Sequence, residues 1–158
     1  MKFIFLSIFL IISKNIFSSQ IDDIRKLYVQ SSNSLENAFK LQKITNDLVF
    51  SDDAFNKHSE KIFKNPNISG YLASSFFLIA KNSKNIFLKF KNFEIGKFIL
   101  EKLIHNFPNN LELIILRHNI QTNCPKVLNY DDSLADDFFF IEKNIHLFDN
   151  LKMLTNVR

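Results

Sequence analysis

The chain has 158 residues, a formal net charge of +4, and only two Gly and three Pro. So few turn-forming residues argue against a sheet protein built on tight hairpins and favour an all-α fold. The single cysteine, Cys124, excludes an intramolecular disulfide, so stability must come from packing.

Residues 1–18 have the three-part layout of a secretory signal peptide. A lysine precedes a ten-residue run, 3–12, that is apolar except for one serine, and small residues follow at Ser18 and Ser19. A ten-residue helix reaches about 15 Å, half of a hydrocarbon core about 30 Å thick. We therefore expect cleavage between Ser18 and Ser19, an exported protein that is periplasmic or secreted, and a single helical domain over 19–158.

The alternative is an uncleaved membrane anchor over residues 3–17, which would place Lys14 in lipid at a cost of about 3 kcal/mol.

Cleavage after Ser18 also changes the net charge of the protein. Without Lys2 and Lys14, the count of Lys and Arg falls from 20 to 18 against 16 Asp and Glu, a net charge of +2. Because both signs are interleaved, we expect no nucleic acid or anionic-lipid partner, and membrane attachment only through an uncleaved signal.

Apolar spacing predicts six to eight helices in one irregular bundle or array. A capping box is predicted at 33–36 and a further helix cap at 51–53. The segment 69–82 is apolar on most sides and should lie at the buried centre. We expect 84–92 to be a short helix or connector. The predicted major helices cover 21–31, 35–48, 54–63, 69–82, 93–107, 110–122 and 131–147.

The last predicted helix begins in an acidic run, 131–137, which suits the positive end of the helix dipole. This run lacks the glycine and the spaced oxygens of a calcium loop. An apolar seam follows, and the tail from residue 149 is expected to be a frayed turn. The seam consists of Leu134, Phe138, Ile141, Ile145 and Phe148.

Residues 94–122 resemble the second helix of a tetratricopeptide repeat, its closing proline turn and the start of the next helix. Gly96 lies where that repeat has a small residue for close helix packing, Leu100 and Leu103 follow at packing positions, and Pro108 breaks the helix. No 34-residue period appears elsewhere, so the resemblance implies one tetratricopeptide-like hairpin and not a solenoid.

The longer stretch 96–141 is similar to small exported all-helical proteins of Bacteroidetes-type bacteria, a group with no established activity. That resemblance implies export and a helical fold, and no mechanism. The residues that carry it are Pro108-Asn109-Asn110-x-Glu112, Arg117, Gln121, Pro125, Leu128, Tyr130 and Asp137.

The most concentrated polar run surrounds Arg117 and Gln121, which are four residues apart and share a helical face. We interpret this pair as a structural clamp. Arg117 is expected to dock on Asp137, and Gln121 to satisfy loop backbone before the helix break at Pro125. The alternative is a recognition surface.

No motif indicates catalysis, a nucleotide or a cofactor, and no metal is expected. The four histidines, His58, His105, His118 and His146, lack ligand spacing. Cys124 has no second cysteine or convincing histidine partner, and is interpreted as a packing residue, with pairing to another chain as the alternative.

These observations favour a non-catalytic helical scaffold or protein-interaction module that meets another envelope or secreted protein. The alternative from a different class is a carrier of a small apolar ligand, or a helical enzyme with an unrecognised pocket. Nineteen Phe could line such a cavity, although packing is their ordinary use. The oligomeric state is left open.

Overall fold

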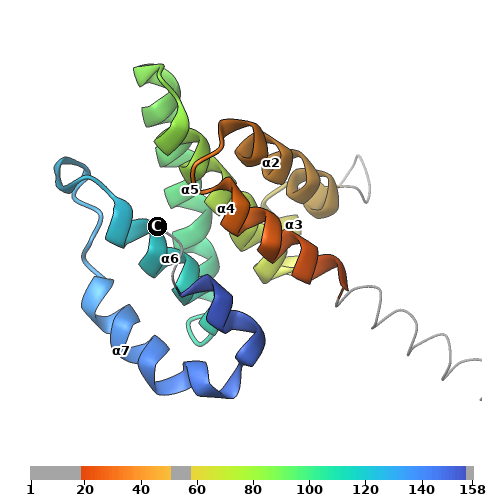
Figure 1. Cartoon of the computed structure of the whole chain (residues 1–158), viewed down its shortest axis with the longest axis vertical. Coiled ribbons are helices and arrows are strands. Elements are labelled where there is room, and N and C mark those ends of the chain that lie inside the picture. Colours follow the sequence, from red (N-terminus) through yellow and green to blue (C-terminus); the bar gives the residue numbers. More distant parts are fainter. Residues whose placement is uncertain (1–18, 51–57, 156–158) are drawn as a thin grey trace, which may run out of the picture.

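The structure is a computed structural model that describes residues 19–50 and 58–155 (Figure 1). The predicted signal peptide, 1–18, and the predicted cap at 51–53 lie outside the described residues. Within the described ranges every regular element is helical, which confirms the all-α fold class. The elements are a helix at 19–31, α2 (Leu35–Phe50), α3 (His58–Lys64), α4 (Pro66–Asn82), α5 (Ile86–Asn106), α6 (Leu111–Asn123), η1 (Lys126–Leu128), α7 (Leu134–Asn144), η2 (Ile145–Leu147) and η3 (Asp149–Leu154).

Asparagine side chains begin three consecutive helices. Asn65 precedes α4, whose first residue is Pro66, a position where the missing N–H costs nothing. Asn85 and Asn110 each accept hydrogen bonds from two backbone N–H groups in the first turns of α5 and α6. Ser34 caps α2 by accepting from the Asn37 N–H at 3.2 Å. An asparagine-rich sequence therefore supplies its own helix starts.

Helix α4 lies at the centre of the molecule, as its apolar sequence predicts. It packs against α2 on one side and α5 on another, with α6 and the 19–31 helix completing its surroundings (Figure 1). Twelve of its residues are buried, including Tyr71 and Leu72. A helix buried on nearly all sides needs apolar or small residues around its whole circumference, which is the pattern that the sequence shows.

Two predicted boundaries are wrong. Residues 84–92 are not a separate connector, because α5 runs unbroken for 21 residues from Ile86 to Asn106. Its first half exposes Phe87 and Phe90, so the amphipathic stripe that would reveal a helix is absent there. The tail from 149 is not frayed either. It forms η3, and Leu151 and Leu154 are buried in the core.

The predicted seam of the last helix is only partly buried. Helix α7 ends at Asn144 and continues as η2, and Ile141 is its buried apolar residue. Phe138 and Phe148 are 46% and 45% exposed. The acidic run 131–137 leads into α7 without a side-chain cap, since Ser133 makes no side-chain hydrogen bond to the helix start.

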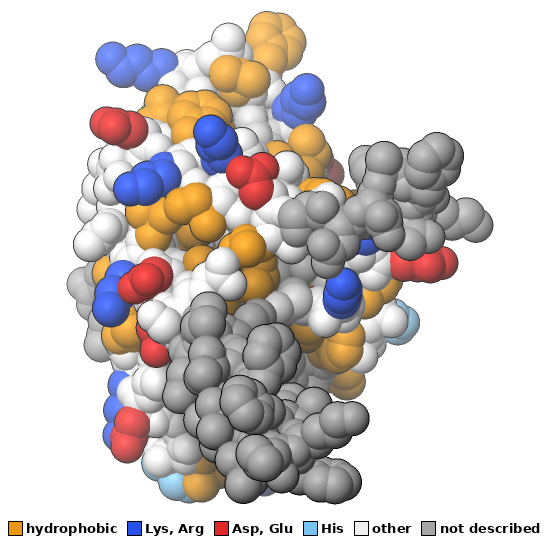
Figure 2. Space-filling view, turned by 90° about the vertical axis from the view of Figure 1, so that its right-hand side faces the viewer, with side chains coloured by type: hydrophobic (Ala, Val, Ile, Leu, Met, Phe, Trp, Pro, Cys, Tyr) orange, Lys and Arg blue, Asp and Glu red, His pale blue; other side chains and the backbone are white. Residues whose placement is uncertain are grey.

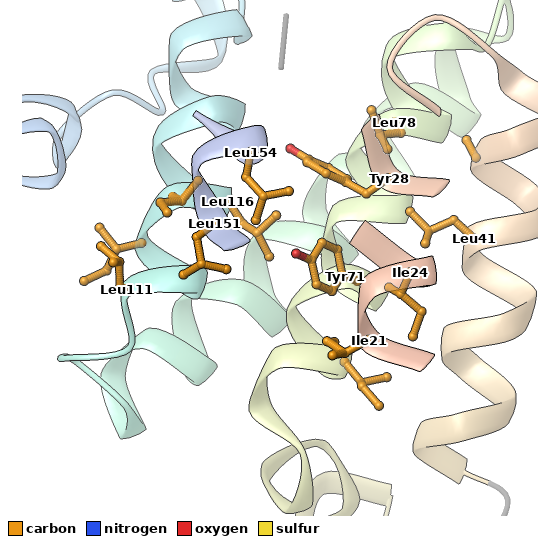
Figure 3. Close-up of a cluster of buried hydrophobic side chains, with 14 of the residues drawn as sticks. Ile21, Ile24, Tyr28, Leu41, Tyr71, Leu78, Leu111, Leu116, Leu151 and Leu154 are labelled. Carbon is orange, nitrogen blue, oxygen red and sulfur yellow. The ribbon is translucent and has the colours of Figure 1, made fainter. Parts of the chain in front are cut away.

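One part of the core joins the two ends of the described chain. Ile21, Ile24 and Tyr28 of the 19–31 helix pack with Tyr71 of α4, and residues of α6 and Leu154 of η3 meet them (Figure 3). The rings of Tyr28 and Tyr71 meet edge to face, with centroids 5.5 Å apart. The helix that directly follows the predicted cleavage position is thus a core element.

Gly96 brings α5 against α4. A Cβ at this position would lie 2.9 Å from the Ala73 carbonyl oxygen and 2.8 Å from Cδ2 of Phe77. Gly70 does the same between α4 and α6, where a Cβ would lie 2.5 Å from Cδ2 of Leu113. Pro108 and Pro125 follow the ends of α5 and α6. The tetratricopeptide-like character of the α5–α6 hairpin stays a prediction.

We expect Gly96→Ala to lower the free energy of unfolding by about 1–3 kcal/mol. Alanine normally stabilises a helix relative to glycine, so a loss would report the clash with the α4 backbone. The measurement is urea unfolding, with the exposed Lys91→Ala in the same helix as control, expected to stay within about 0.5 kcal/mol. A stabilised Gly96→Ala chain would contradict the close approach of α4 and α5.

Candidate functional site

A buried carboxylate, Glu112, lies in the first turn of α6 and is 3% exposed. Its Oε1 accepts hydrogen bonds from Arg25 Nε at 2.7 Å and the Tyr71 hydroxyl at 2.6 Å. Its Oε2 accepts from Arg25 Nη2 and Asn67 Nδ2, both at 2.8 Å. Four donors thus fill the acceptor capacity of one carboxylate. Glu112 is thereby joined to the 19–31 helix through Arg25 and to α4 through Tyr71 and Asn67.

This network keeps Arg25 charged and Tyr71 neutral. Burial works against the charge of Arg25, but hydrogen bonds to Glu112 and Asp22 outweigh burial and raise the Arg25 pKa. Burial, then the negative charge of Glu112, raise the pKa of Tyr71 well above its ordinary value. Because both oxygens of Glu112 accept hydrogen bonds from protein donors, the network holds the 19–31 helix, α4 and α6 together.

A second network surrounds Arg117 of α6. Its Nε and Nη2 donate to the two carboxylate oxygens of Asp137 in α7, at 2.8 and 2.7 Å. Its Nη1 donates to Glu101 of α5 at 3.1 Å. The Tyr130 hydroxyl donates to the other oxygen of Glu101 at 2.6 Å. The expected partner of Arg117 is thus in place, with Glu101 and Tyr130 as additional members.

Gln121 does not act as the sequence suggests. It is 3% exposed, and its side-chain oxygen accepts no hydrogen bond within the described part of the chain. The turn before Pro125 is closed by backbone, with the Cys124 N–H donating to the Gln121 carbonyl oxygen at 3.2 Å. The clamp therefore consists of Arg117 and Asp137, without a contribution from the Gln121 amide.

We expect Arg117→Met to lower the free energy of unfolding by about 3 kcal/mol, because it leaves the buried Asp137 without its partner. Thermal and urea unfolding measure this loss. Lys152→Met removes an exposed ion pair with Asp149 and is the matched control, expected to leave the melting temperature unchanged. Equal melting temperatures for Arg117→Met and the parent chain would disprove the clamp.

An apolar pocket of about 340 Å³ lies where the 19–31 helix, α4, α5 and α6 meet the segment 124–128. Tyr28, Phe77 and Phe93 supply aromatic walls, and Ile120 and Leu128 line it from α6 and η1. The rings of Phe77 and Phe93 meet edge to face at 5.4 Å, which fixes this wall. This volume is at the small end of the range of about 300–1,000 Å³ for ligand sites.

Two polar side chains of the pocket wall are engaged in hydrogen bonds within the protein. Ser74 Oγ donates to the Gly70 carbonyl oxygen at 2.9 Å, and Asn119 Nδ2 donates to the Leu154 carbonyl oxygen at 2.7 Å. Burial raises the pKa of Tyr28 to about 12, so its hydroxyl is neutral at physiological pH. At Ser74 and Asn119 the wall consequently presents polar groups that already have partners.

The charged residues that line the pocket have one sign. Lys81 and Lys89 line it, and no Asp or Glu is among its lining residues. The mouth is apolar, since Ile86, Phe90 and Val127 line the pocket and are 56%, 53% and 88% exposed. An apolar interior with two lysines matches a ligand that has an apolar tail and a negative group.

Cys124 lines the same pocket. Burial, followed by the nearby charge of Asp131, raises the pKa of its half-buried thiol. A raised pKa keeps the thiol protonated at neutral pH, which is unsuited to a nucleophile. Cys124 is therefore a wall residue that can report whether the pocket is filled.

Nowhere in 19–50 and 58–155 do three or more His, Cys, Asp or Glu side chains converge as a metal site would require. No helix in the same ranges has the length and apolar character needed to cross a membrane. His118 packs against Phe138, with ring centroids 6.1 Å apart.

Neither the Glu112 network nor the position of the pocket is apparent from the amino-acid sequence. Glu112 follows a helix-capping asparagine, where an acidic residue is ordinarily an exposed partner of the helix dipole. A usable signal is the apolar sequence on both sides of it, Leu111 and Leu113 to Leu116, which makes burial of the whole turn unavoidable.

No protein-family profile, curated protein or solved structure matches this chain.

Proposed function

We propose that this protein is a non-catalytic binding protein for a small amphiphile with one apolar chain and an anionic head group. The observation that carries the proposal is the pocket, with apolar walls and with Lys81 and Lys89 as its charged residues. The chain would lie between Tyr28, Phe77 and Phe93, and the head group at the lysines. Burying apolar surface supplies most of the affinity, and the lysines select the head group.

Export is part of the proposal. The signal-like residues 1–18 support a periplasmic or secreted location, and cleavage after Ser18 would leave the core residues Ile21 and Ile24 in the domain. An anchored form retaining 3–17 is the alternative topology. A carrier of amphiphiles outside the cytoplasm would keep poorly soluble chains from aggregating in water.

A protein-interaction module is the second candidate, and the exposed aromatic side chains of α7 favour it. Phe138 and Phe139 pack edge to face at 5.8 Å, and Phe139 is 69% exposed. Exposed aromatics of this kind are enriched at protein interfaces. This surface belongs to a different part of the molecule from the pocket, so the two candidates can be tested separately.

Cys124 allows the pocket to be tested, because it is the chain's one thiol. We expect dodecanoate at about ten times its Kd to slow alkylation of Cys124 by iodoacetamide about tenfold, by mass action. The raised pKa predicts that the alkylation rate of the empty protein reaches its midpoint at a higher pH than that of a cysteine peptide. Unfolding in urea should abolish both effects.

Two comparisons sharpen this experiment. Dodecanol has the same alkyl chain as dodecanoate but no charge, and should protect Cys124 of the parent chain less than dodecanoate does. In the double variant Lys81→Gln with Lys89→Gln, this advantage of dodecanoate over dodecanol should disappear. Ile120→Phe and, independently, Leu128→Phe should fill the pocket and weaken protection by dodecanoate. Unchanged alkylation at every dodecanoate concentration, in a chain that unfolds cooperatively, would overturn the proposed function.

A further inference from the structure

A run of apolar side chains is exposed at the beginning of α5. Ile86, Phe87, Leu88 and Phe90 are 56%, 82%, 44% and 53% exposed, and we name them the α5 patch. Asn85 holds the turn that presents them, since its side chain accepts from the N–H groups of Phe87 and Leu88 at 2.9 and 3.2 Å. The patch is therefore displayed by a capped helix start.

Lysines surround the patch. Between residues 81 and 93 the sequence has Lys81, Lys84, Lys89 and Lys91, and no Asp or Glu. None of these lysines pairs with a carboxylate in the described part of the structure. Figure 2 shows hydrophobic side chains at the upper end of the molecule, with blue basic side chains on either side of them. Unpaired positive charge thus flanks exposed apolar surface.

We propose that the α5 patch and its lysines dock the protein on the surface of an anionic lipid bilayer. Apolar side chains of this kind enter the boundary between head groups and acyl chains, while lysines remain at the level of the anionic head groups. The net charge of residues 19–158 is only +2, which by itself gives no sign of a basic surface. The four lysines at 81–93 nevertheless form a local concentration of positive charge. Of the acidic run 131–137, Asp131 is near Cys124 in the pocket wall, whereas α7, which begins at Leu134, lies away from the α5 patch (Figure 1).

The shape of the patch favours a bilayer over a protein partner. The α4–α5 turn projects at one end of the molecule (Figure 1), whereas a stable protein interface buries about 800 Å² on each partner. Protein interface cores are also depleted in lysine, and here lysines alternate with the aromatic residues. A narrow projecting tip that carries both Phe and Lys can insert into the head-group layer of a bilayer without the large contact area that a protein partner requires.

The pocket opens within this surface, because Ile86, Lys89 and Phe90 line its mouth. Docking would therefore place the mouth against the lipid from which an amphiphile enters or leaves. Only this last step rests on the proposed function. Phe87 and Leu88 do not line the pocket, so docking and ligand binding can fail independently.

The test is flotation of the protein that remains after cleavage at Ser18, residues 19–158, with lipid vesicles. We expect binding to vesicles that contain phosphatidylglycerol to be at least about tenfold stronger than to pure phosphatidylcholine, and to weaken as salt is raised. Phe87→Ser with Leu88→Ser should abolish binding, and Lys84→Gln with Lys91→Gln should remove the preference for anionic vesicles. Neither variant should change protection of Cys124 by dodecanoate.

Matched controls are Phe139→Ser and Lys143→Gln on α7, which remove an exposed aromatic ring and an exposed charge elsewhere. Both should bind vesicles as the parent chain does. Binding that survives Phe87→Ser with Leu88→Ser, or is equal on both kinds of vesicle, would overturn the proposal. The proposal would also be overturned if the parent chain self-associates without lipid and Phe87→Ser with Leu88→Ser abolishes that self-association. The α5 patch would then bind a second copy of the chain. Ile120→Phe should bind vesicles normally even where it blocks the pocket.

Discussion

The bidentate pair between Arg25 and Glu112 is the interaction on which the arrangement of the helices depends. Both side chains are almost fully buried, so each charge requires the other. The pair fixes the 19–31 helix against α6, and Tyr71 and Asn67 of α4 complete the set of donors. Helix α6 is held again at its midpoint, where Arg117 joins Asp137 of α7 and Glu101 of α5. One helix thus carries both ionic networks, and its neighbours take their positions from it.

The pocket is a consequence of this arrangement. Its walls come from the 19–31 helix, α4, α5 and α6, all of which the two networks tie together directly or through α6. Gly96 keeps α5 close to α4 along the middle of both helices. Beyond that contact the first turns of α5 carry the exposed α5 patch, and the mouth of the pocket opens beside it. Binding a chain, selecting an anionic head group and docking on lipid would then all occur at one end of the molecule.

The sequence predicts the elements of this fold better than their burial. Few glycines and prolines, and the 3.6-residue spacing of apolar side chains, are sufficient to predict an all-α fold with α4 at its centre. The Arg117–Asp137 pair is predicted because an arginine on one helix is the natural partner of a carboxylate in the acidic start of the last helix, where Asp137 is one of four aspartates. The burial of Glu112 is not predictable in this way, because local spacing does not distinguish an exposed acidic first turn from a buried one. Two predictions are wrong, the separate helix or connector at 84–92 and the frayed tail from 149. In both segments tertiary contacts, and not local sequence, decide which side chains are buried. Phe87 is apolar but exposed, and Leu154 is buried by α6 and the 19–31 helix.

A double-mutant cycle on the central pair tests this account most directly. The free energy of unfolding in urea is measured for Arg25→Met, Glu112→Leu, the double variant and the parent chain. Each single variant leaves a buried charge unpaired and should cost about 3–5 kcal/mol, whereas the double variant should cost far less than the sum. A coupling energy of about 2 kcal/mol or more is the predicted result. Losses that add to within about 0.5 kcal/mol would show that the two side chains act independently, and would contradict the central role of the pair.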